Sequence, residues 1–254
     1  MKVNNMKADY KKPIMIAGPC SVENYEMMDK TAQFLKRIGV NYIRGGVFKP
    51  RTSPNSFQGL GVSGLEILKQ IKKDYGLLVV SEILDIRDLE KCLDVVDVIQ
   101  IGSRNMYNYP LLKEVGKTNK TVILKRGMSA TYDEWINASE YIKMGGNEDI
   151  ILCERGIRTF EPSTRNTLDL SCIPLIKQKT NLRIIVDPSH GTGIRDIVEP
   201  MSMAAIAAGA DGLIIETHPE PDRAISDGFQ SVDFETFEKI YFKTLKLYKT
   251  MKDL

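Results

Sequence analysis

Eight short apolar segments recur along the whole chain, and each is followed by a stretch of different periodicity. They cover residues 14–18, 41–46, 77–82, 97–102, 121–127, 149–156, 183–191 and 211–219. Continuous runs of Ile, Val and Leu are typical of strands that are buried on both faces, as in a parallel sheet. Between them, apolar residues recur at helical spacing, for instance over residues 25–39, 63–76 and 131–146. The alternation predicts eight βα units.

Eight consecutive βα units favour a closed (β/α)8 barrel, the TIM barrel, over an open doubly wound sheet. An open sheet of the dinucleotide-binding type would carry G-x-G-x-x-G after its first strand, whereas residues 18–23 read Gly-Pro-Cys-Ser-Val-Glu. A length of 254 residues is ordinary for one barrel domain, and no linker or low-complexity tract divides the chain. We predict a single TIM-barrel domain over residues 1–254, in which residues 1–13 form a short strand or hairpin under the barrel.

Charge and cysteine usage narrow the class of protein. The chain has 35 Lys and Arg against 33 Asp and Glu, without a dense basic run, so neither nucleic acid nor an anionic membrane is an expected partner. The N-terminus lacks the apolar core of a signal peptide, and no window reaches the length of a membrane span. Four cysteines without a Cys-x-x-Cys pair fit free thiols in a reducing compartment. We predict a cytoplasmic protein.

Charged and metal-binding side chains gather where the predicted strands end. In a TIM barrel the carboxyl ends of the strands carry the active site. Unpaired buried charges are costly, so charges that recur at strand ends indicate a polar pocket. The positions are Cys20, Arg44, Lys49, Glu82, Arg104, Lys125, Arg126, Glu154, Arg155, Asp187, His190 and Glu216, with Asp227 soon after the last strand.

Strands 7, 8 and 1 become neighbours when a barrel closes, and this brings together four potential metal ligands. They are Cys20, His190, Glu216 and Asp227. A thiolate, an imidazole and two carboxylates suit Mn, Fe, Co or Zn better than Mg or Ca. A loop histidine held by a neighbouring carbonyl group is the alternative for His190. We interpret His190 as a ligand of a divalent transition metal.

The strands opposite this cluster end in five basic residues: Arg44, Lys49, Arg104, Lys125 and Arg155. Arginine forks suit phosphate and carboxylate groups, and lysine adds a point charge and a proton donor. The alternative is a ring of structural salt bridges with Glu82 and Glu154. Because five cations exceed two acids, we predict a binding site for a multiply charged anion. Arg158 and Arg165 are interpreted as members of surface ion pairs.

Motifs spread over the whole predicted barrel together resemble 3-deoxy-D-arabino-heptulosonate-7-phosphate (DAHP) synthases, in particular the short type I beta form without an N-terminal regulatory domain. The motifs are AGPCSVE, KPRTSPNSFQG, QIGSRNM, LKRG, ERGIRTFE, TRNTLD, DPSHGTG and HPEPDRAISDGFQ. The resemblance implies an enzyme, 3-deoxy-7-phosphoheptulonate synthase. Such enzymes condense phosphoenolpyruvate with erythrose 4-phosphate and release phosphate, in the first committed step of the shikimate pathway to chorismate and the aromatic amino acids.

The same resemblance implies roles for individual residues. The four candidate ligands, Cys20, His190, Glu216 and Asp227, match the metal-ligand positions of the family. The five basic residues, Arg44, Lys49, Arg104, Lys125 and Arg155, match its phosphoenolpyruvate contacts. Arg51 and Thr52, in Lys-Pro-Arg-Thr, match its sugar-phosphate motif. Lys49 is the implied acid or base, and Glu82 or a metal-bound water is implied to activate the attacking water.

Two other functions stay open beside this one. The first is 3-deoxy-D-manno-octulosonate 8-phosphate synthase, which uses arabinose 5-phosphate and typically reads Lys-Ala-Asn-Arg-Ser where this chain reads Lys-Pro-Arg-Thr at residues 49–52. The second is a non-catalytic barrel that binds sugar phosphates, although the intact sets of ligands and cations argue against it. The resemblance also implies a homotetramer or homodimer. Since the first predicted strand begins within about fifteen residues, we expect no intrinsic feedback inhibition by phenylalanine, tyrosine or tryptophan. Control by a separate partner such as a chorismate mutase stays open.

Overall fold

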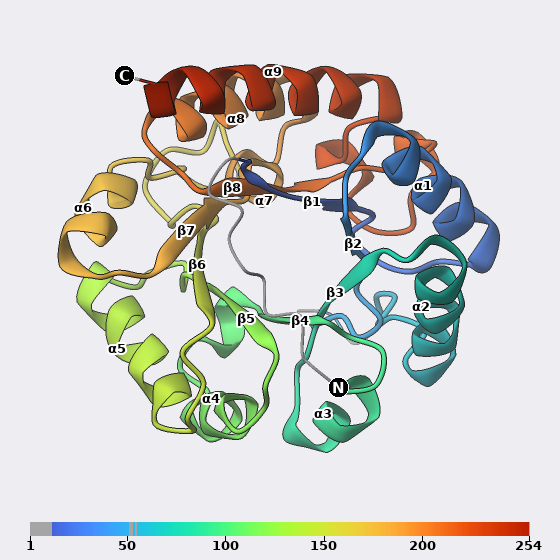
Figure 1. The fold of residues 1–254 in the computed structure, drawn as a ribbon, viewed down its shortest axis with the longest axis horizontal. Coiled ribbons are helices and arrows are strands. Elements are labelled where there is room, and N and C mark those ends of the chain that lie inside the picture. Colours follow the sequence, from blue (N-terminus) through green and yellow to red (C-terminus); the bar gives the residue numbers. More distant parts are fainter. Residues whose placement is uncertain (1–11, 51–52, 54, 254) are drawn as a thin grey trace.

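Eight parallel strands close into a barrel in the computed structural model, which describes residues 12–50, 53 and 55–253 (Figure 1). The strands are β1 (Ile14–Gly18), β2 (Tyr42–Arg44), β3 (Leu78–Glu82), β4 (Val98–Ile101), β5 (Thr121–Lys125), β6 (Ile150–Glu154), β7 (Arg183–Val186) and β8 (Gly212–Glu216). Their order around the barrel follows the sequence, and β8 pairs with β1 from Ile14 opposite Gly212 to Gly18 opposite Glu216. The predicted TIM-barrel fold is confirmed. Residues 1–13 were predicted as a strand or hairpin, and residues 1–11 of this segment lie outside the described residues.

Helices surround the barrel, as Figure 1 shows, except for the single turn of α7, which lies at one end of it. They are α1 (Tyr25–Ile38), α2 (Val62–Tyr75), α3 (Ile86–Cys92), α4 (Tyr109–Gly116), α5 (Tyr132–Lys143), α6 (Cys172–Lys179), α7 (Pro188–Thr192), α8 (Val198–Ala207) and α9 (Phe234–Asp253). Their ends follow local chemistry. The side chain of Asn24 accepts the N–H of Met27 before α1, and Thr131 forms a capping box with Glu134 before α5. No helix in the described part of the chain has the length and apolarity to cross a membrane.

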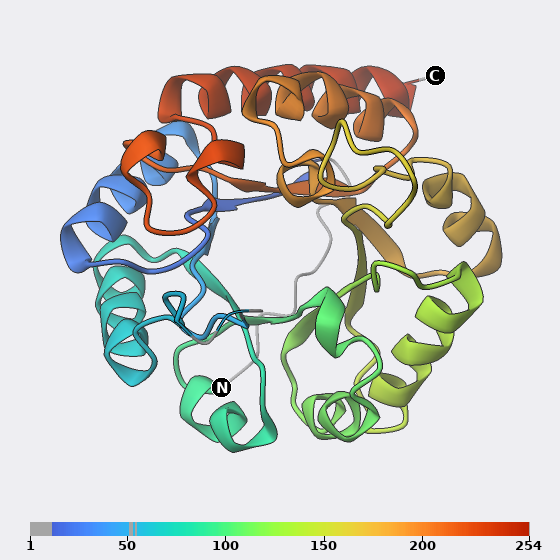
Figure 2. The ribbon, with the colours of Figure 1, turned by 180° about the vertical axis from the view of Figure 1, so that it is seen from behind.

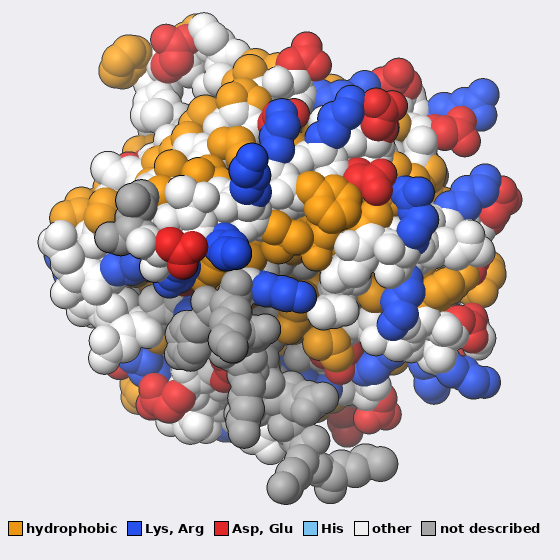
Figure 3. All heavy atoms as spheres, turned by 45° about the horizontal axis from the view of Figure 1, so that its top comes forward, with side chains coloured by type: hydrophobic (Ala, Val, Ile, Leu, Met, Phe, Trp, Pro, Cys, Tyr) orange, Lys and Arg blue, Asp and Glu red, His pale blue; other side chains and the backbone are white. Residues whose placement is uncertain are grey.

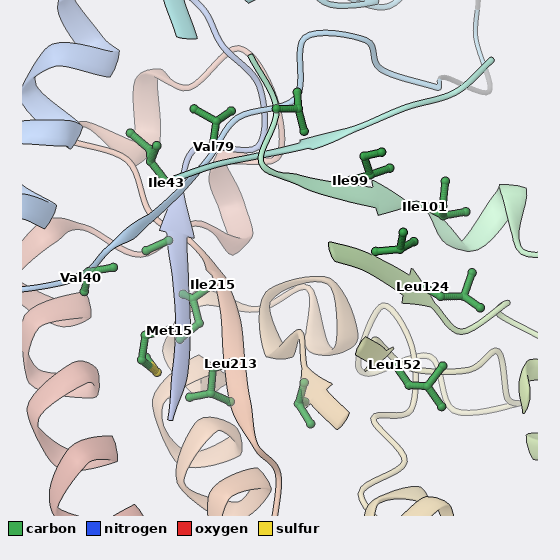
Figure 4. Packing of buried hydrophobic residues seen from close by; sticks show 14 of the residues in the cluster. Met15, Val40, Ile43, Val79, Ile99, Ile101, Leu124, Leu152, Leu213 and Ile215 are labelled. Carbon is green, nitrogen blue, oxygen red and sulfur yellow. The ribbon is translucent and has the colours of Figure 1, made fainter. Parts of the chain in front are cut away.

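Two apolar layers hold the barrel together. Side chains on the outer face of the strands, such as Ile43, Val79 and Leu124, pack in the layer between the strands and the helices (Figure 4). Alternate residues fill the barrel itself: Ile16, Val80, Val98, Ile123, Ile151, Cys153, Ile185 and Ile214. The barrel is therefore a packed core and not a pore, so a ligand can be held only at its ends. On the surface of Figure 3, acidic, basic and apolar side chains are intermixed.

The predicted seventh strand is shorter than expected. Strand β7 ends at Val186, and residues 188–192 form the single turn of α7. Pro188 stands at the first helical position, where its fixed φ favours a helix, and Asp187 caps the turn by accepting the N–H of His190 at 2.9 Å. The fifth and sixth strands also end two residues earlier than predicted. Lys125 and Glu154 therefore end their strands, and Arg126 and Arg155 lie on the loops that follow at the carboxyl end of the barrel.

Candidate active site

The four predicted metal ligands meet at the carboxyl end of the barrel. Their ligand atoms all lie within 4.8 Å of one another: Cys20 Sγ, a ring nitrogen of His190, and a carboxylate oxygen each of Glu216 and Asp227. Glu216 ends β8, Cys20 follows β1, and His190 lies in α7. In Figure 2, which views the barrel from the other side, α7 and the segments after β6 and β8 lie at this end. The prediction that these strands bring the four residues together is confirmed.

The donor set fits a transition metal. The ring of His190 has Nδ1 2.8 Å from Asp187 Oδ2 and Nε2 3.4 Å from Glu216 Oε1. We assign the ring proton to Nδ1 because it faces this carboxylate, which leaves the Nε2 lone pair toward the cluster. Burial lowers the pKa of His190, although Asp187 opposes this shift, so the imidazole is neutral near pH 7. Oε1 of Glu216 is buried and accepts no hydrogen bond among the described residues.

Cys20 is protonated in the absence of a cation. Burial, with the charge of Glu216 adding to it, raises the pKa of its thiol to about 12. The thiol donates to Asp227 Oδ2 at 3.1 Å, and its sulfur lies 3.1 Å from the hydroxyl of Ser226. A metal bound as a thiolate complex must therefore displace this proton.

Asp187 links the metal cluster to the basic pocket. Its buried carboxylate lies 2.8 Å from His190 Nδ1 through Oδ2, and the same oxygen accepts a hydrogen bond from Lys125 Nζ at 2.5 Å. Burial alone would raise the pKa of Asp187, but the ring of His190, which faces its carboxylate, and the charge of Lys125 hold it well below its usual value. From the sequence, Asp187 is predicted only as a charge at a strand end. Its capping role is indicated in the sequence by the Asp-Pro pair before a turn.

A cavity of about 350 Å³ opens beside the cluster, and all five predicted basic residues line it. They are Arg44, Lys49, Arg104, Lys125 and Arg155. Its volume lies in the range of small-molecule sites. Among the described residues, no carboxylate forms an ion pair with Arg104 or Arg155. Arg51 and Thr52, the predicted sugar-phosphate contacts, lie outside the described residues.

The basic residues and the metal cluster are less separate than the sequence suggested. Arg44 Nη2 lies 3.0 Å from Glu216 Oε1. Lys49 Nζ donates to the carbonyl oxygen of Cys20 at 3.0 Å and lies 3.1 Å from its sulfur. The cause is strand order, because β2 pairs directly with β1, with Ala17 opposite Ile43. Arg44 and Lys49 therefore border both halves of the site.

Only some of the charged residues at the strand ends form structural salt bridges. Arg126 Nη1 lies 3.0 Å from Glu154 and 2.8 Å from Asp169, and its guanidinium group stacks on the ring of Tyr132. Glu82 instead lines the cavity beside Gly102, where an added Cβ would lie 1.9 Å from Glu82 Oε1. Glycine at position 102 thus leaves room for the Glu82 carboxylate. Arg126 and Glu154 thus form a structural salt bridge. Within the described residues, none of the five candidate cations pairs with Glu82 or Glu154, although Arg44 pairs with Glu216 and Lys125 with Asp187.

Two residues of the site escaped the sequence analysis. Arg165, interpreted there as part of a surface ion pair, lines the cavity, with Nη1 3.7 Å from Asp227 Oδ1. Its Nη1 also donates to the side-chain oxygen of Gln230 at 2.8 Å. The amide of Gln230, which is fully buried, donates in turn to Glu216 Oε2 at 2.6 Å. Both residues belong to loops, and nothing in the sequence pattern alone distinguishes them from surface polar residues.

Known proteins match the chain over nearly its full length. The sequence pattern of the DAHP synthetase I family matches residues 2–252. Phospho-2-dehydro-3-deoxyheptonate aldolase of Thermotoga maritima is 55% identical over 233 residues, which cover 92% of this chain and 69% of that relative. A 2-dehydro-3-deoxyphosphooctonate aldolase of Francisella tularensis subsp. holarctica is 34% identical over 247 residues, covering 90% of this chain and 89% of the relative.

Solved structures give the same picture. The crystal structure of the Thermotoga maritima DAHP synthase superposes with a TM-score of 0.90 at 54% identity, covering 93% of this chain and 69% of that one. A truncated form of 3-deoxy-D-arabino-heptulosonate 7-phosphate synthase from the same organism gives a TM-score of 0.87 at 50% identity, covering 93% and 87%. The similarity therefore extends over the barrel that carries the cluster and the cavity.

Proposed function

The chain belongs to the DAHP synthetase I family, and we infer from this that it is a 3-deoxy-7-phosphoheptulonate synthase. It condenses phosphoenolpyruvate with erythrose 4-phosphate to DAHP and phosphate, the first step of the shikimate pathway. The observation that carries the mechanism is one cavity that is bordered both by four potential metal ligands and by five basic side chains. The 2-dehydro-3-deoxyphosphooctonate aldolases, at 30–34% identity, are more distant relatives.

Cys20, His190, Glu216 and Asp227 are proposed to hold a divalent transition metal, such as Mn, Fe, Co or Zn. When bound, this ion supplies Lewis-acid polarisation of the aldehyde oxygen of the sugar phosphate. The support for this site is its mixed donor set and the orientation of His190, whose Nε2 faces the cluster while Asp187 holds Nδ1.

The basic residues are proposed to bind phosphoenolpyruvate, with Arg165 added to the five found from the sequence. Burial, together with the neighbouring charge of Arg165, lowers the pKa of Arg155 despite the opposing charge of Asp187. Two guanidinium groups near each other in one cavity repel, and a phosphate dianion relieves this repulsion. Arg51 and Thr52 are proposed, from the family motif alone, to bind the phosphate of erythrose 4-phosphate.

Bond formation begins when C3 of phosphoenolpyruvate attacks the aldehyde carbon. Lys49 is proposed to donate the proton that the former carbonyl oxygen takes up as it becomes a hydroxyl. Burial would lower the pKa of Lys49, but its contact with Cys20 and the negative charges of Glu82 and Glu216 raise it overall, so the side chain is an ammonium group near pH 7. Its position beside Cys20 places this donor next to the metal cluster.

Water then attacks C2, where positive charge has developed, and gives a hemiketal phosphate. The C2–O bond to the phosphate breaks as the hemiketal hydroxyl becomes the C2 ketone, and the proton of that hydroxyl goes to the departing phosphate. Glu82 is proposed to accept the proton of this water, because its carboxylate lines the cavity without an ion-pair partner among the described residues. The proton that leaves the water and the proton that Lys49 gives balance over one turnover. We further propose that the enzyme works in the cytoplasm as a homodimer or homotetramer, as the family resemblance implies.

Erythrose 4-phosphate is expected to be strongly preferred over arabinose 5-phosphate. In the sequence, Pro50 disfavours a helical backbone at Lys49, and Arg51 places a phosphate-binding fork two residues from this lysine. A longer sugar anchored at Arg51 would hold its aldehyde out of reach, and a misplacement of about 1 Å costs on the order of a hundredfold in rate. The measurement is kcat/KM for both aldoses at saturating metal.

The variant Arg51→Ala should erode this preference, mainly through a higher KM for the sugar phosphate. Equal specificity constants for the two aldoses in the unaltered protein, or a preference for arabinose 5-phosphate, would favour the octulosonate synthase instead. Tight binding of both substrates without any turnover would favour the non-catalytic barrel.

A further inference from the structure

The loop that carries Asp227 has an unusual backbone conformation. This loop connects β8 to α9 over residues 217–233. Asp227 has φ 53° and is the single residue other than glycine with a positive φ in the described part of the chain. Side chains with a Cβ rarely adopt this region, and Asp tolerates it better than most residues. The conformation therefore persists only where surrounding contacts hold the loop in place.

One buried carboxylate fastens this loop to the segment that carries Cys20. Glu23 follows Cys20 by three residues, and its side chain is only 8% exposed. Its Oε1 accepts the N–H of Ile225 at 2.8 Å, and its Oε2 lies 3.6 Å from Nε2 of His218. Ile225 and His218 both belong to the loop. Glu23 thus contacts the loop at two points, one near its start and one two residues before Asp227.

The ring of His218 is oriented to support this contact. Its Nδ1 accepts the N–H of Glu220 at 3.0 Å, which places the ring proton on Nε2. Nε2 is buried and finds no hydrogen-bond partner within the described residues; it faces Glu23. An N–H on a buried ring that faces a carboxylate at 3.6 Å is favourable electrostatically, because burial lowers the local dielectric constant.

The far side of the loop has its own anchor. Arg195 Nη2 donates to the carbonyl oxygen of Gly228 and to Asp222, both at 2.8 Å. These contacts tie the loop to the turn before α8 and do not involve the segment around Cys20. Loss of Glu23 would therefore loosen the part of the loop around Ile225 and Asp227, while the rest of the loop stays attached.

We propose that Glu23 is a positioning residue of the metal centre: it holds Asp227 against Cys20 so that the ligands are in place before a metal arrives. The inference rests on the proposed metal site. At present Asp227 Oδ2 and Ser226 Oγ each lie 3.1 Å from Cys20 Sγ. If the loop left this arrangement for part of the time, the apparent Kd for the metal would rise in inverse proportion to the fraction of protein that is competent to bind.

The test is a titration of the metal-free protein with Co²⁺, followed through the absorption that thiolate coordination to Co²⁺ produces. Glu23→Ala removes both contacts and should raise the Kd about 10–100-fold, the range found when groups that orient metal ligands are lost. Glu23→Gln keeps an oxygen for the N–H of Ile225 but turns a second donor toward His218. Its Kd for Co²⁺ should therefore lie between those of the unaltered protein and Glu23→Ala. The matched control is Glu220→Ala, on the same loop with a half-exposed side chain, which should bind Co²⁺ as the unaltered protein does.

Hydrogen exchange of the metal-free proteins supplies a readout independent of the metal. In Glu23→Ala, amides of residues 225–227 should exchange faster while those of the barrel strands keep their protection. Unchanged Co²⁺ affinity in Glu23→Ala, or faster exchange over the whole barrel, would overturn the inference. If the unaltered protein itself gave no thiolate absorption with Co²⁺, the proposed metal centre would fail, and the exchange data would still decide whether Glu23 holds the loop.

Discussion

A protein that carries His190→Ala is expected to lose metal binding and turnover together. The neutral imidazole is one of the four proposed side-chain ligands, and its Nε2 faces the other three. Loss of groups that merely orient a ligand already costs 10–100-fold in metal affinity, so removal of the ligand itself should cost at least about 100-fold. Cys20→Ala should behave in the same way. Metal content after dialysis and phosphate release over a range of metal concentrations measure the two effects.

The matched control for the thiol is Cys92→Ala. Cys92 is also a buried free thiol, but it ends α3 and does not line the cavity. This variant should lose stability, because a cavity replaces the sulfur, and keep its metal and its turnover. Full turnover by metal-free protein, or by His190→Ala without bound metal, would contradict the assignment of the four ligands.

Asp187→Ala should lower the free energy of unfolding of the metal-free protein by about 3–5 kcal/mol, the cost of breaking a buried ion pair. The reason is the Lys125 ammonium group, whose side chain is 5% exposed and which contacts Asp187 at 2.5 Å. Without the carboxylate, a cation stays buried without a partner, and the ring of His190 loses the group that orients it. Urea unfolding monitored by tryptophan fluorescence measures the change, because Trp135 is the single tryptophan and is buried.

A double-mutant cycle with Lys125→Met separates this pair from a general packing defect. Methionine removes the charge, so the double variant should be less destabilised than the sum of the two single variants. A loss below about 1 kcal/mol in Asp187→Ala, or strict additivity in the cycle, would show that the contact does not carry the stability assigned to it.

The barrel and the metal ligands were accessible from the sequence because both follow from strand order. Runs such as Ile-Ile-Val at residues 184–186 mark strands that are buried on both faces, and eight of them imply closure. Closure makes β8 and β1 neighbours, which brings Glu216 next to Cys20 although they are distant in the chain. Residues at strand ends are thus placed by topology alone.

The positions of loop residues could not be predicted from strand order. The contacts of Arg165 and Gln230 depend on how two loops fold over the barrel end, and strand periodicity says nothing about that path. The prediction that the seventh strand extends to residue 191 was wrong for a related reason, because Pro188 starts a helical turn directly after Asp187. Arg44 and Lys49, predicted to lie opposite the metal cluster, instead border it because β2 pairs directly with β1.

The most direct test of the proposed chemistry is phosphate release by the purified protein with phosphoenolpyruvate and erythrose 4-phosphate. With a saturating divalent transition metal, one phosphate should appear for each seven-carbon product formed. Release should stop when a chelator removes the metal and resume when the metal is restored. A folded, metal-loaded protein that releases no phosphate above the blank from this pair of substrates would contradict the assigned reaction.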